Sequence, residues 1–277
     1  MDDERSIPTV TVIGTCRVHH PLRAIEEKGL IHLNNGGMGS FVHSSPEALV
    51  RLKVLLGMKT YEEHLLKLQV GESKEIKLKP DEGFDFSNSD ILVIEISTIK
   101  AISFFDNPLQ VNEINRHMCT PHGEFGKMLR HNLSQSFNGR KEYVDMPEIE
   151  IPESYPIDYI EIINNLKPVV LSEKEIFEDL KDISSLIKIP ILIVNHINLP
   201  GRDGKPITSR NKLCNIINKY SEIENVAVFN PVEIFNRHKR EDLLMKNGED
   251  LNHYAKENLL IVGNEQFGMT RIDESTW

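Results

Sequence analysis

Short, almost entirely apolar runs alternate along this chain with segments that carry helix start and stop signals. The apolar runs cover residues 8–13, 30–34, 91–96, 190–195 and 226–229. Runs of this length that are apolar on both faces are typical of strands buried in a parallel sheet. Strands that alternate with helices need both faces of the sheet covered, which favours an α/β architecture.

Helix signals lie between the apolar runs. Pro21 suits an early helical position, and Gly29 ends the helix that follows it. Ser45 and Pro46 predict the start of a helix through residue 56, and Ser172 with Glu175 forms the pattern of a capping box. Further helices are predicted near residues 61–69, 157–166 and 213–220. The sum is a three-layer α/β/α sandwich with a central, mostly parallel sheet.

One segment breaks this rhythm. Residues from about 101 to 155 combine clustered His, Asn, Gly and Pro with an acidic, proline-rich stretch at 146–152. We interpret it as an insertion or lid within a single domain that spans residues 1–277.

Composition limits the partners of the chain. With 42 acidic and 32 basic side chains in 277 residues, the formal charge is −10, which argues against nucleic acid or an anionic membrane surface as partner. The N-terminal residues are acidic where a signal peptide is basic, and no apolar run approaches the ~20 residues of a membrane span. We therefore expect a cytoplasmic protein. Its three cysteines are far apart and odd in number, so no disulfide framework is indicated.

Cys16 stands at the turn between the first predicted strand and the first helix, in the stretch Gly14-Thr15-Cys16-Arg17. A thiol at a helix N-terminus faces unpaired backbone N–H groups and the positive end of the helix dipole, which lower its pKa. Arg17 adds a cation beside it. The sequence therefore predicts an activated nucleophile at Cys16, although a buried structural cysteine is the common alternative.

Asp250 and His253, three residues apart before the last helical run, offer an acid and an imidazole. The pair predicts a Cys-His-Asp relay in which His253 is the base for Cys16 and Asp250 orients it. His19, His20 and His196 are the next candidates for the base. An aspartate cap and a surface histidine would explain the same two residues without chemistry.

These blocks, in this order and at this approximate spacing, resemble those of the SGNH (GDSL-like) hydrolases. The triplet Gly14-Thr15-Cys16 takes the place of the family's G-D-S turn, so the chain is similar to relatives with a cysteine nucleophile, including GSCFA-type proteins and capsule-polysaccharide acetyltransferases. The resemblance implies the sandwich fold and acyl or ester chemistry. The final D-x-x-H block is intact as Asp250 and His253.

The resemblance also implies donors for an oxyanion. These are the backbone N–H of Cys16 and a glycine N–H after the second strand, here Gly36 or Gly37. The family asparagine that follows the central strand is missing. Its expected substitutes are Ser97, Thr98 or, preferred among them, Asn195.

The expected function is acyl transfer through a covalent Cys16 intermediate, as an acyltransferase or as a thioesterase or esterase. Arg17 and His19, beside the thiol, are the expected substrate-binding side chains. No cofactor is required. A small-molecule or carrier-bound acyl thioester, of coenzyme A or of carrier-protein pantetheine, is the expected donor, because thiols exchange readily with thioesters. The acyl group, its acceptor and the oligomeric state stay open.

Two other classes remain possible. The clusters 16–20 and 117–122 contain Cys and His side chains, which would suit a zinc-dependent hydrolase or a metal-binding protein, although neither has the spacing of a strong zinc motif. A catalytically inactive scaffold of the same fold is the third class, and the missing asparagine is its main support.

Overall fold

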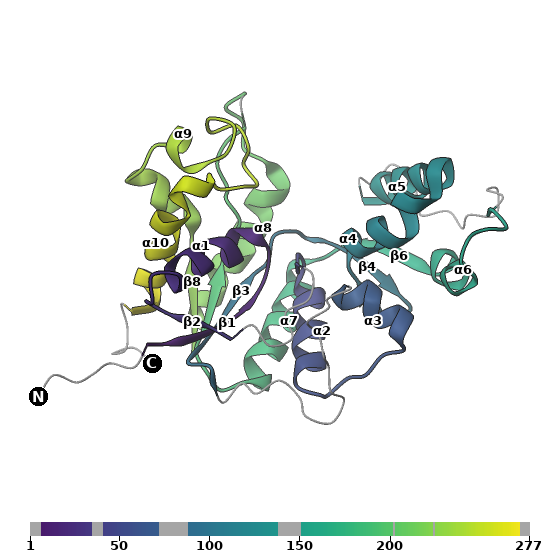
Figure 1. Cartoon of the computed structure of the whole chain (residues 1–277), viewed down its shortest axis with the longest axis horizontal. Helices are drawn as coiled ribbons and strands as arrows, with labels where there is room; N and C mark the ends of the chain where they lie inside the picture. Colours follow the sequence, from purple (N-terminus) through teal and green to yellow (C-terminus); the bar gives the residue numbers. More distant parts are fainter. Residues whose placement is uncertain are drawn as a thin grey trace, which may run out of the picture.

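The central sheet contains five parallel strands (Figure 1). A computed structural model describes residues 7–34, 41–71, 88–137, 151–201, 203–223 and 225–271. Across the sheet the strands follow the order β2 (His32–Leu33), β1 (Thr9–Ile13), β3 (Ile91–Glu95), β7 (Ile191–Val194) and β8 (Val226–Phe229). The expected strands are therefore present, and the second is shorter than residues 30–34.

Helices cover both faces of this sheet. On one face α1 (Cys16–Glu26) and α10 (Leu259–Arg271) pack on β1 and β3 through an apolar cluster that contains Val18, Leu22 and Val262. On the other face α2 (Ser45–Leu55), α7 (Glu173–Leu186) and α8 (Thr208–Asn218) enclose a second cluster. This arrangement confirms the three-layer α/β/α sandwich. The remaining described α-helices are α3 (Glu63–Val70), α4 (Val111–Ile114), α5 (Gly123–Phe137), α6 (Ile157–Asn164) and α9 (Arg240–Leu243).

The first helix begins five residues earlier than Pro21 predicted. Thr15 caps α1, its side chain accepting from the backbone N–H of Arg17, so Cys16 is the first helical residue. Pro21 then lies inside the helix and cannot donate to the Arg17 carbonyl four residues before it. Gln266 of α10 donates to that carbonyl instead, at 3.4 Å. A tertiary contact therefore replaces the missing helical bond.

A second, antiparallel sheet follows the central strand directly. It has the order β5 (Asn107–Leu109), β4 (Lys100–Phe104), β6 (Leu166–Val170), and it packs with α5 and α6 around an apolar core of its own. Figure 1 shows this unit beside α2 and α3, at one end of the molecule. The segment expected as an insertion, 101–155, thus pairs through β4 with β6, beyond its expected end. The short helical turns Asn115–Cys119 and Thr120–His122 connect α4 to α5.

None of the helices in the described ranges has the length and apolar character needed to cross a bilayer.

Candidate functional site

The candidate site lies where the carboxyl ends of β1, β3 and β7 meet. Strand β2, which follows β1 in sequence, lies on one side of β1, and β3 lies on the other, so the chain reverses its direction of winding between β1 and β3. Ligands of open α/β sheets bind at such a crevice. Cys16 follows β1, Glu95 ends β3, and Asn195 and His196 follow β7.

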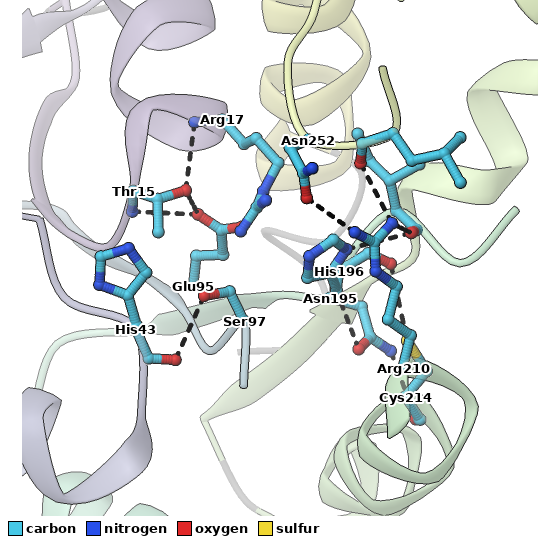
Figure 2. A network of polar contacts seen from close by, with 12 residues as sticks. Thr15, Arg17, His43, Glu95, Ser97, Asn195, His196, Arg210, Cys214 and Asn252 are labelled. Carbon is cyan, nitrogen blue, oxygen red and sulfur yellow. Dashed lines mark hydrogen bonds and ion pairs between the residues drawn. The ribbon is translucent and has the colours of Figure 1, made fainter. Parts of the chain in front are cut away.

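Glu95 is fully buried and holds the turn that carries Cys16. One carboxylate oxygen accepts from both the backbone N–H and the hydroxyl of Thr15, and the other accepts from Nε of Arg17 at 2.5 Å (Figure 2). Gly14 makes this close approach possible, because a Cβ there would lie 2.7 Å from Val18 and 2.8 Å from the Cβ of Glu95. Glu95 was not among the functional residues predicted from the sequence. Its signal was a single carboxylate inside the apolar run 91–96.

The electrostatics at Cys16 differ from the expectation. The thiol is half-buried, and burial raises its pKa. Arg17 acts to lower that pKa, but the charges of Glu95 and Asp250 act to raise it, and the net pKa lies above its ordinary value. The prediction of a lowered pKa was therefore wrong, because neither the burial of the thiol nor the Glu95 carboxylate beside Arg17 could be seen in the sequence. Cys16 rests as a thiol and requires a base to become a nucleophile.

The structure joins Asp250 and His253. Nδ1 of His253 lies 3.0 Å from Oδ2 of Asp250, and the backbone N–H of Asn252 donates to Oδ1 of Asp250 at 2.9 Å. Partial burial acts to raise the pKa of Asp250, but these two hydrogen bonds outweigh it and hold the pKa below its usual range. The His253 side chain is 52% exposed. The described residues contain no hydrogen bond between the thiol and His253, but Asp250 is close enough to influence the pKa of Cys16.

Arg210 of α8 braces the loop that carries this pair. Its guanidinium donates to the carbonyl of Leu251 at 3.2 Å and to Oδ1 of Asn252 at 2.7 Å, and also to the carbonyl of Ile197 after β7 at 3.2 Å (Figure 2). The loop 250–253 is thereby tied to the carboxyl edge of the sheet. Sequence reasoning missed Arg210, since nothing near it in the chain marks it out.

Of the three side chains expected to replace the family asparagine, Ser97 and Asn195 use their side-chain donors elsewhere, whereas the Thr98 hydroxyl accepts a hydrogen bond and keeps its own donor. The backbone N–H groups of Ser97 and Thr98 donate to the carbonyl of His43, as does the Ser97 hydroxyl, and the Thr98 hydroxyl accepts from Lys100. Nδ2 of Asn195 donates to the carbonyl of Cys214 and to Oδ1 of Asn218, both outside the crevice on α8 (Figure 2).

Asn195 thus ties β7 to α8, which favours a structural role for this residue. Gly36 and Gly37 lie outside the described residues.

Burial lowers the pKa of three histidines near the site, His196, His43 and His19. Burial, aided by neighbouring Arg17 and Arg210, lowers the pKa of His196 to about 2, and its Nδ1 lies 3.0 Å from the Ile197 carbonyl. Burial also lowers the pKa of His43. His19 packs against Phe41, and burial lowers its pKa to about 4.

The expected metal ligands do not converge. Within the described part of the chain, no three His, Cys, Asp or Glu side chains are grouped so that they would hold a metal ion. In the cluster 117–122, His117 pairs with Glu113 and His122 packs on Tyr155, while burial raises the pKa of the Cys119 thiol to about 11.

Two comparisons with known proteins each match most of the chain. The chain is similar to the Vi polysaccharide biosynthesis protein TviD of Salmonella typhi, with 23% identity over 253 residues. This match covers 89% of the chain and 30% of the relative, so the chain spans less than a third of that protein's length. The profile of the TviD N-terminal domain matches residues 8–268, from the start of β1 into α10. The chain therefore belongs to the TviD N-terminal domain family.

Proposed function

We propose that the chain is an acyl-transfer enzyme of polysaccharide biosynthesis that forms a covalent acyl intermediate on Cys16. The observation that carries the proposal is the hydrogen-bonded pair of Asp250 and His253, held by Arg210 at the sheet edge where Cys16 opens α1. The relationship to a polysaccharide biosynthesis protein supports the substrate class. An SGNH-type relay agrees with the order of these residues along the chain.

The hydrogen bond between Asp250 and His253 indicates which nitrogen of His253 acts as the base. Because the Asp250 carboxylate can only accept, Nδ1 of His253 carries the proton in their hydrogen bond, and Nε2 is left with the lone pair. In the proposed reaction, Nε2 takes the proton from the Cys16 thiol, and the thiolate attacks the carbonyl carbon of an acyl thioester or ester. The raised pKa of Cys16 makes this proton transfer necessary.

Collapse of the tetrahedral intermediate breaks the bond to the leaving group, which receives the proton from His253 and departs as a thiol or alcohol. A saccharide hydroxyl or water then attacks the acyl group on Cys16, giving its proton to His253. The thiolate leaves and recovers that proton. A hydroxyl acceptor gives transfer, and water gives hydrolysis.

Intact-protein mass spectrometry after incubation with a panel of acyl thioesters and activated esters tests this proposal. We expect one acyl adduct on Cys16, and none in Cys16→Ala. His253→Ala should slow acylation by roughly 1,000-fold or more, and Asp250→Asn by less. Cys119→Ala changes a cysteine in the apolar core of the antiparallel sheet. It is the matched control and should acylate normally. Absence of an adduct on Cys16, with every donor, would leave the inactive scaffold as the better account.

A further inference from the structure

The segment 41–43 crosses the carboxyl ends of β1 and β3, beside the turn that carries the nucleophile. The backbone N–H of Val42 donates to the carbonyl of Gly14 at 3.0 Å, and the carbonyl of His43 accepts from the backbone N–H of Ser97 at 2.7 Å. Figure 2 shows His43 beside the end of β3, with its carbonyl directed at Ser97. The winding of the sheet reverses between these two strands, so the segment forms a rim of the crevice.

The rim begins with an exposed aromatic ring next to the nucleophile. Phe41 is 38% exposed, whereas Val42 after it is 2% exposed. The centroid of the Phe41 ring lies 5.6 Å from that of His19 and 6.4 Å from that of His20. These histidines follow Cys16 by three and four residues in α1, so the three side chains share one face of the helix. Phe41 therefore lies beside the helix face that presents the thiol.

The other end of the rim carries an exposed amide. Nδ2 of Asn112, in α4, lies 3.3 Å from Nε2 of His43. Because the amide nitrogen donates, Nε2 of His43 accepts, and the proton of the neutral ring is on Nδ1, which lies 3.9 Å from Oε2 of the buried Glu47. Within the described ranges the Asn112 side chain makes no other hydrogen bond. Its oxygen and its second N–H are therefore available to a ligand.

An aromatic ring combined with an amide suits a sugar. One face of a pyranose consists of C–H groups, which pack on the electron-rich face of an aromatic ring, and its hydroxyls both donate and accept hydrogen bonds. The rim offers a ring at Phe41 and an amide that can donate and accept at Asn112. Both are exposed, and the hydrogen bonds of residues 41–43 hold them at the edge of the sheet where Cys16 begins its helix.

We propose that Phe41, His43 and Asn112 form the acceptor subsite of the acyl-transfer reaction, and that it binds a saccharide with a pyranose ring on Phe41 and a hydroxyl on the amide of Asn112. The inference rests on the proposed function. His43 is a positioning residue, which holds that amide and does not touch the sugar. One hydroxyl oxygen of the bound saccharide forms the new ester bond to the acyl carbon and gives its proton to His253, while the bond from that carbon to the sulfur of Cys16 breaks.

The test separates the two halves of the reaction. Cys16 is first acylated with an aryl thioester whose released nitrothiophenol is coloured. The acyl enzyme is then mixed with water alone, with glycerol, or with a neutral, an N-acetylated or an acidic oligosaccharide: maltotriose, chitotriose or trigalacturonate. Mass spectrometry of the acylated products gives kcat/KM for each acceptor. We expect at least one oligosaccharide to accept the acyl group better than glycerol does.

Variants of the rim should impair only the second half of the reaction. Phe41→Leu keeps an apolar side chain against the two histidines but removes the ring, so KM for the saccharide should rise by roughly 10-fold. Phe41→Tyr should keep the wild-type KM. Asn112→Ala should lower kcat/KM for the saccharide by roughly 3- to 10-fold. Acylation of Cys16, and hydrolysis of the acyl enzyme without saccharide, should stay within about twofold of the wild type in all three.

Phe177→Leu is the matched control. Phe177, on α7, is 42% exposed and packs on another ring, that of Tyr220 at 5.0 Å between centroids, so its loss should leave KM for the saccharide unchanged.

Three outcomes would overturn the inference. The first is an unchanged kcat/KM for the saccharide in Phe41→Leu or in Asn112→Ala. The second is an equal loss of acylation and transfer, which would show that the rim only supports the turn of Cys16. The third is a normally acylated enzyme that transfers to no saccharide. If Phe41→Leu misfolds, Asn112→Ala, at an exposed side chain, decides alone. Failure of the wild type to acylate Cys16 would instead reject the proposed function.

Discussion

At the scale of single residues, burial of the thiol and the buried carboxylate of Glu95 together hold the pKa of Cys16 above its ordinary value. Glu95 neutralises Arg17 and adds its own negative charge near the thiol. Burial is the largest cause of the raised pKa, and the carboxylate adds to it against the opposite effect of Arg17. This thiol is therefore protected from indiscriminate alkylation or oxidation until a base removes its proton.

Replacing Glu95→Gln should lower the pKa of Cys16, because a negative charge near the thiolate is removed while Arg17 keeps its positive charge. Only the thiolate is alkylated, so the rise in the rate of iodoacetamide labelling at Cys16 should move to lower pH. Asp250→Asn should shift it in the same direction by less, since Asp250 is the weakest influence on this thiol. Peptide mapping of Cys16 against Cys119 across pH measures both. An unchanged profile in Glu95→Gln would contradict this electrostatic account.

At the scale of elements, the helices position Cys16 and the pair of Asp250 and His253, the two halves of the proposed relay. Helix α1 presents Cys16 at its first residue, and α8 holds the loop of Asp250 and His253 through Arg210. Helix α10 packs along α1 and supplies Gln266 to the carbonyl of Arg17. The geometry of the site therefore depends on how these helices pack and not on the strand ends alone.

Arg210→Lys should lower kcat by roughly 10- to 100-fold with a smaller change in KM. Lysine keeps the charge but cannot donate to two carbonyls and an amide at once. The loop that carries His253 would then shift relative to Cys16. Steady-state kinetics on the best acyl donor provide the measurement. Arg130→Lys is the matched control. The Arg130 guanidinium makes two hydrogen bonds of its own, to the side chains of Asn115 and Thr120 in the helical turns before α5. Equal losses in the two variants would show that the effect is not specific to the loop.

Gly263→Ala tests the contact between α10 and α1. A Cβ at residue 263 would lie 2.5 Å from the Pro21 carbonyl oxygen and 2.9 Å from Ile25, so the helices would have to separate. We expect a loss of about 1–3 kcal/mol in the free energy of unfolding, measured by urea denaturation. Gly268→Ala lies on the same helix with no atom within 4 Å of the added Cβ, and should be neutral or stabilising by up to about 1 kcal/mol. Equal changes in unfolding free energy at both positions would argue against tight packing of α10 on α1 at residue 263.

At the scale of the whole molecule, two sheets with separate cores meet at the carboxyl edge of β3. The four residues between β3 and β4 lead directly from the site into the antiparallel sheet, and Nδ2 of Asn112 in α4 lies 3.3 Å from Nε2 of His43. Several titratable groups are buried in this region. The stability of the entire fold is consequently linked to pH through groups such as His196 and Glu47.

His196 should make the protein less stable in acid. Its pKa of about 2 in the folded state lies below the value of about 6.5 in the unfolded chain, so between these values the unfolded state binds the extra proton and gains stability as the pH falls. From pH 7 to pH 5 this effect amounts to about 2 kcal/mol. The fall in unfolding free energy over that range should be smaller by about this amount in His196→Gln.

The change in unfolding free energy with pH must be compared between the wild type and His196→Gln, because carboxyl groups with raised pKa values stabilise the folded state as the pH falls. Glu47, at about 7, and Asp179, at about 6, bind protons in the folded state first and stabilise it as the pH falls. Urea unfolding of the wild type and His196→Gln at both pH values isolates the histidine. Equal losses of unfolding free energy in the two proteins would show that protonation of His196 does not destabilise the folded state.

The sequence by itself determined the central architecture and the contact between Asp250 and His253. Buried parallel strands are recorded as apolar runs, and helix starts as local caps such as Ser172 with Glu175, so both can be predicted from neighbouring residues. Asp250 and His253 were also predictable as a pair, because three residues of separation in one loop bring their side chains together. The apolar strand before Cys16 and the helical segment after it placed this cysteine at the turn into a helix, and the structure has it as the first residue of α1.

Only the tertiary structure decided the electrostatics and the remaining partners. Glu95 is 78 residues from Arg17 in sequence, Gln266 is 249 from it, and β4 pairs with β6 across more than 60 residues. Asn195 was expected in the crevice, but its amide is used on α8. Local patterns report the conformation and burial of their own segment, whereas a pKa or a hydrogen-bond partner depends on which distant segments the fold brings into contact.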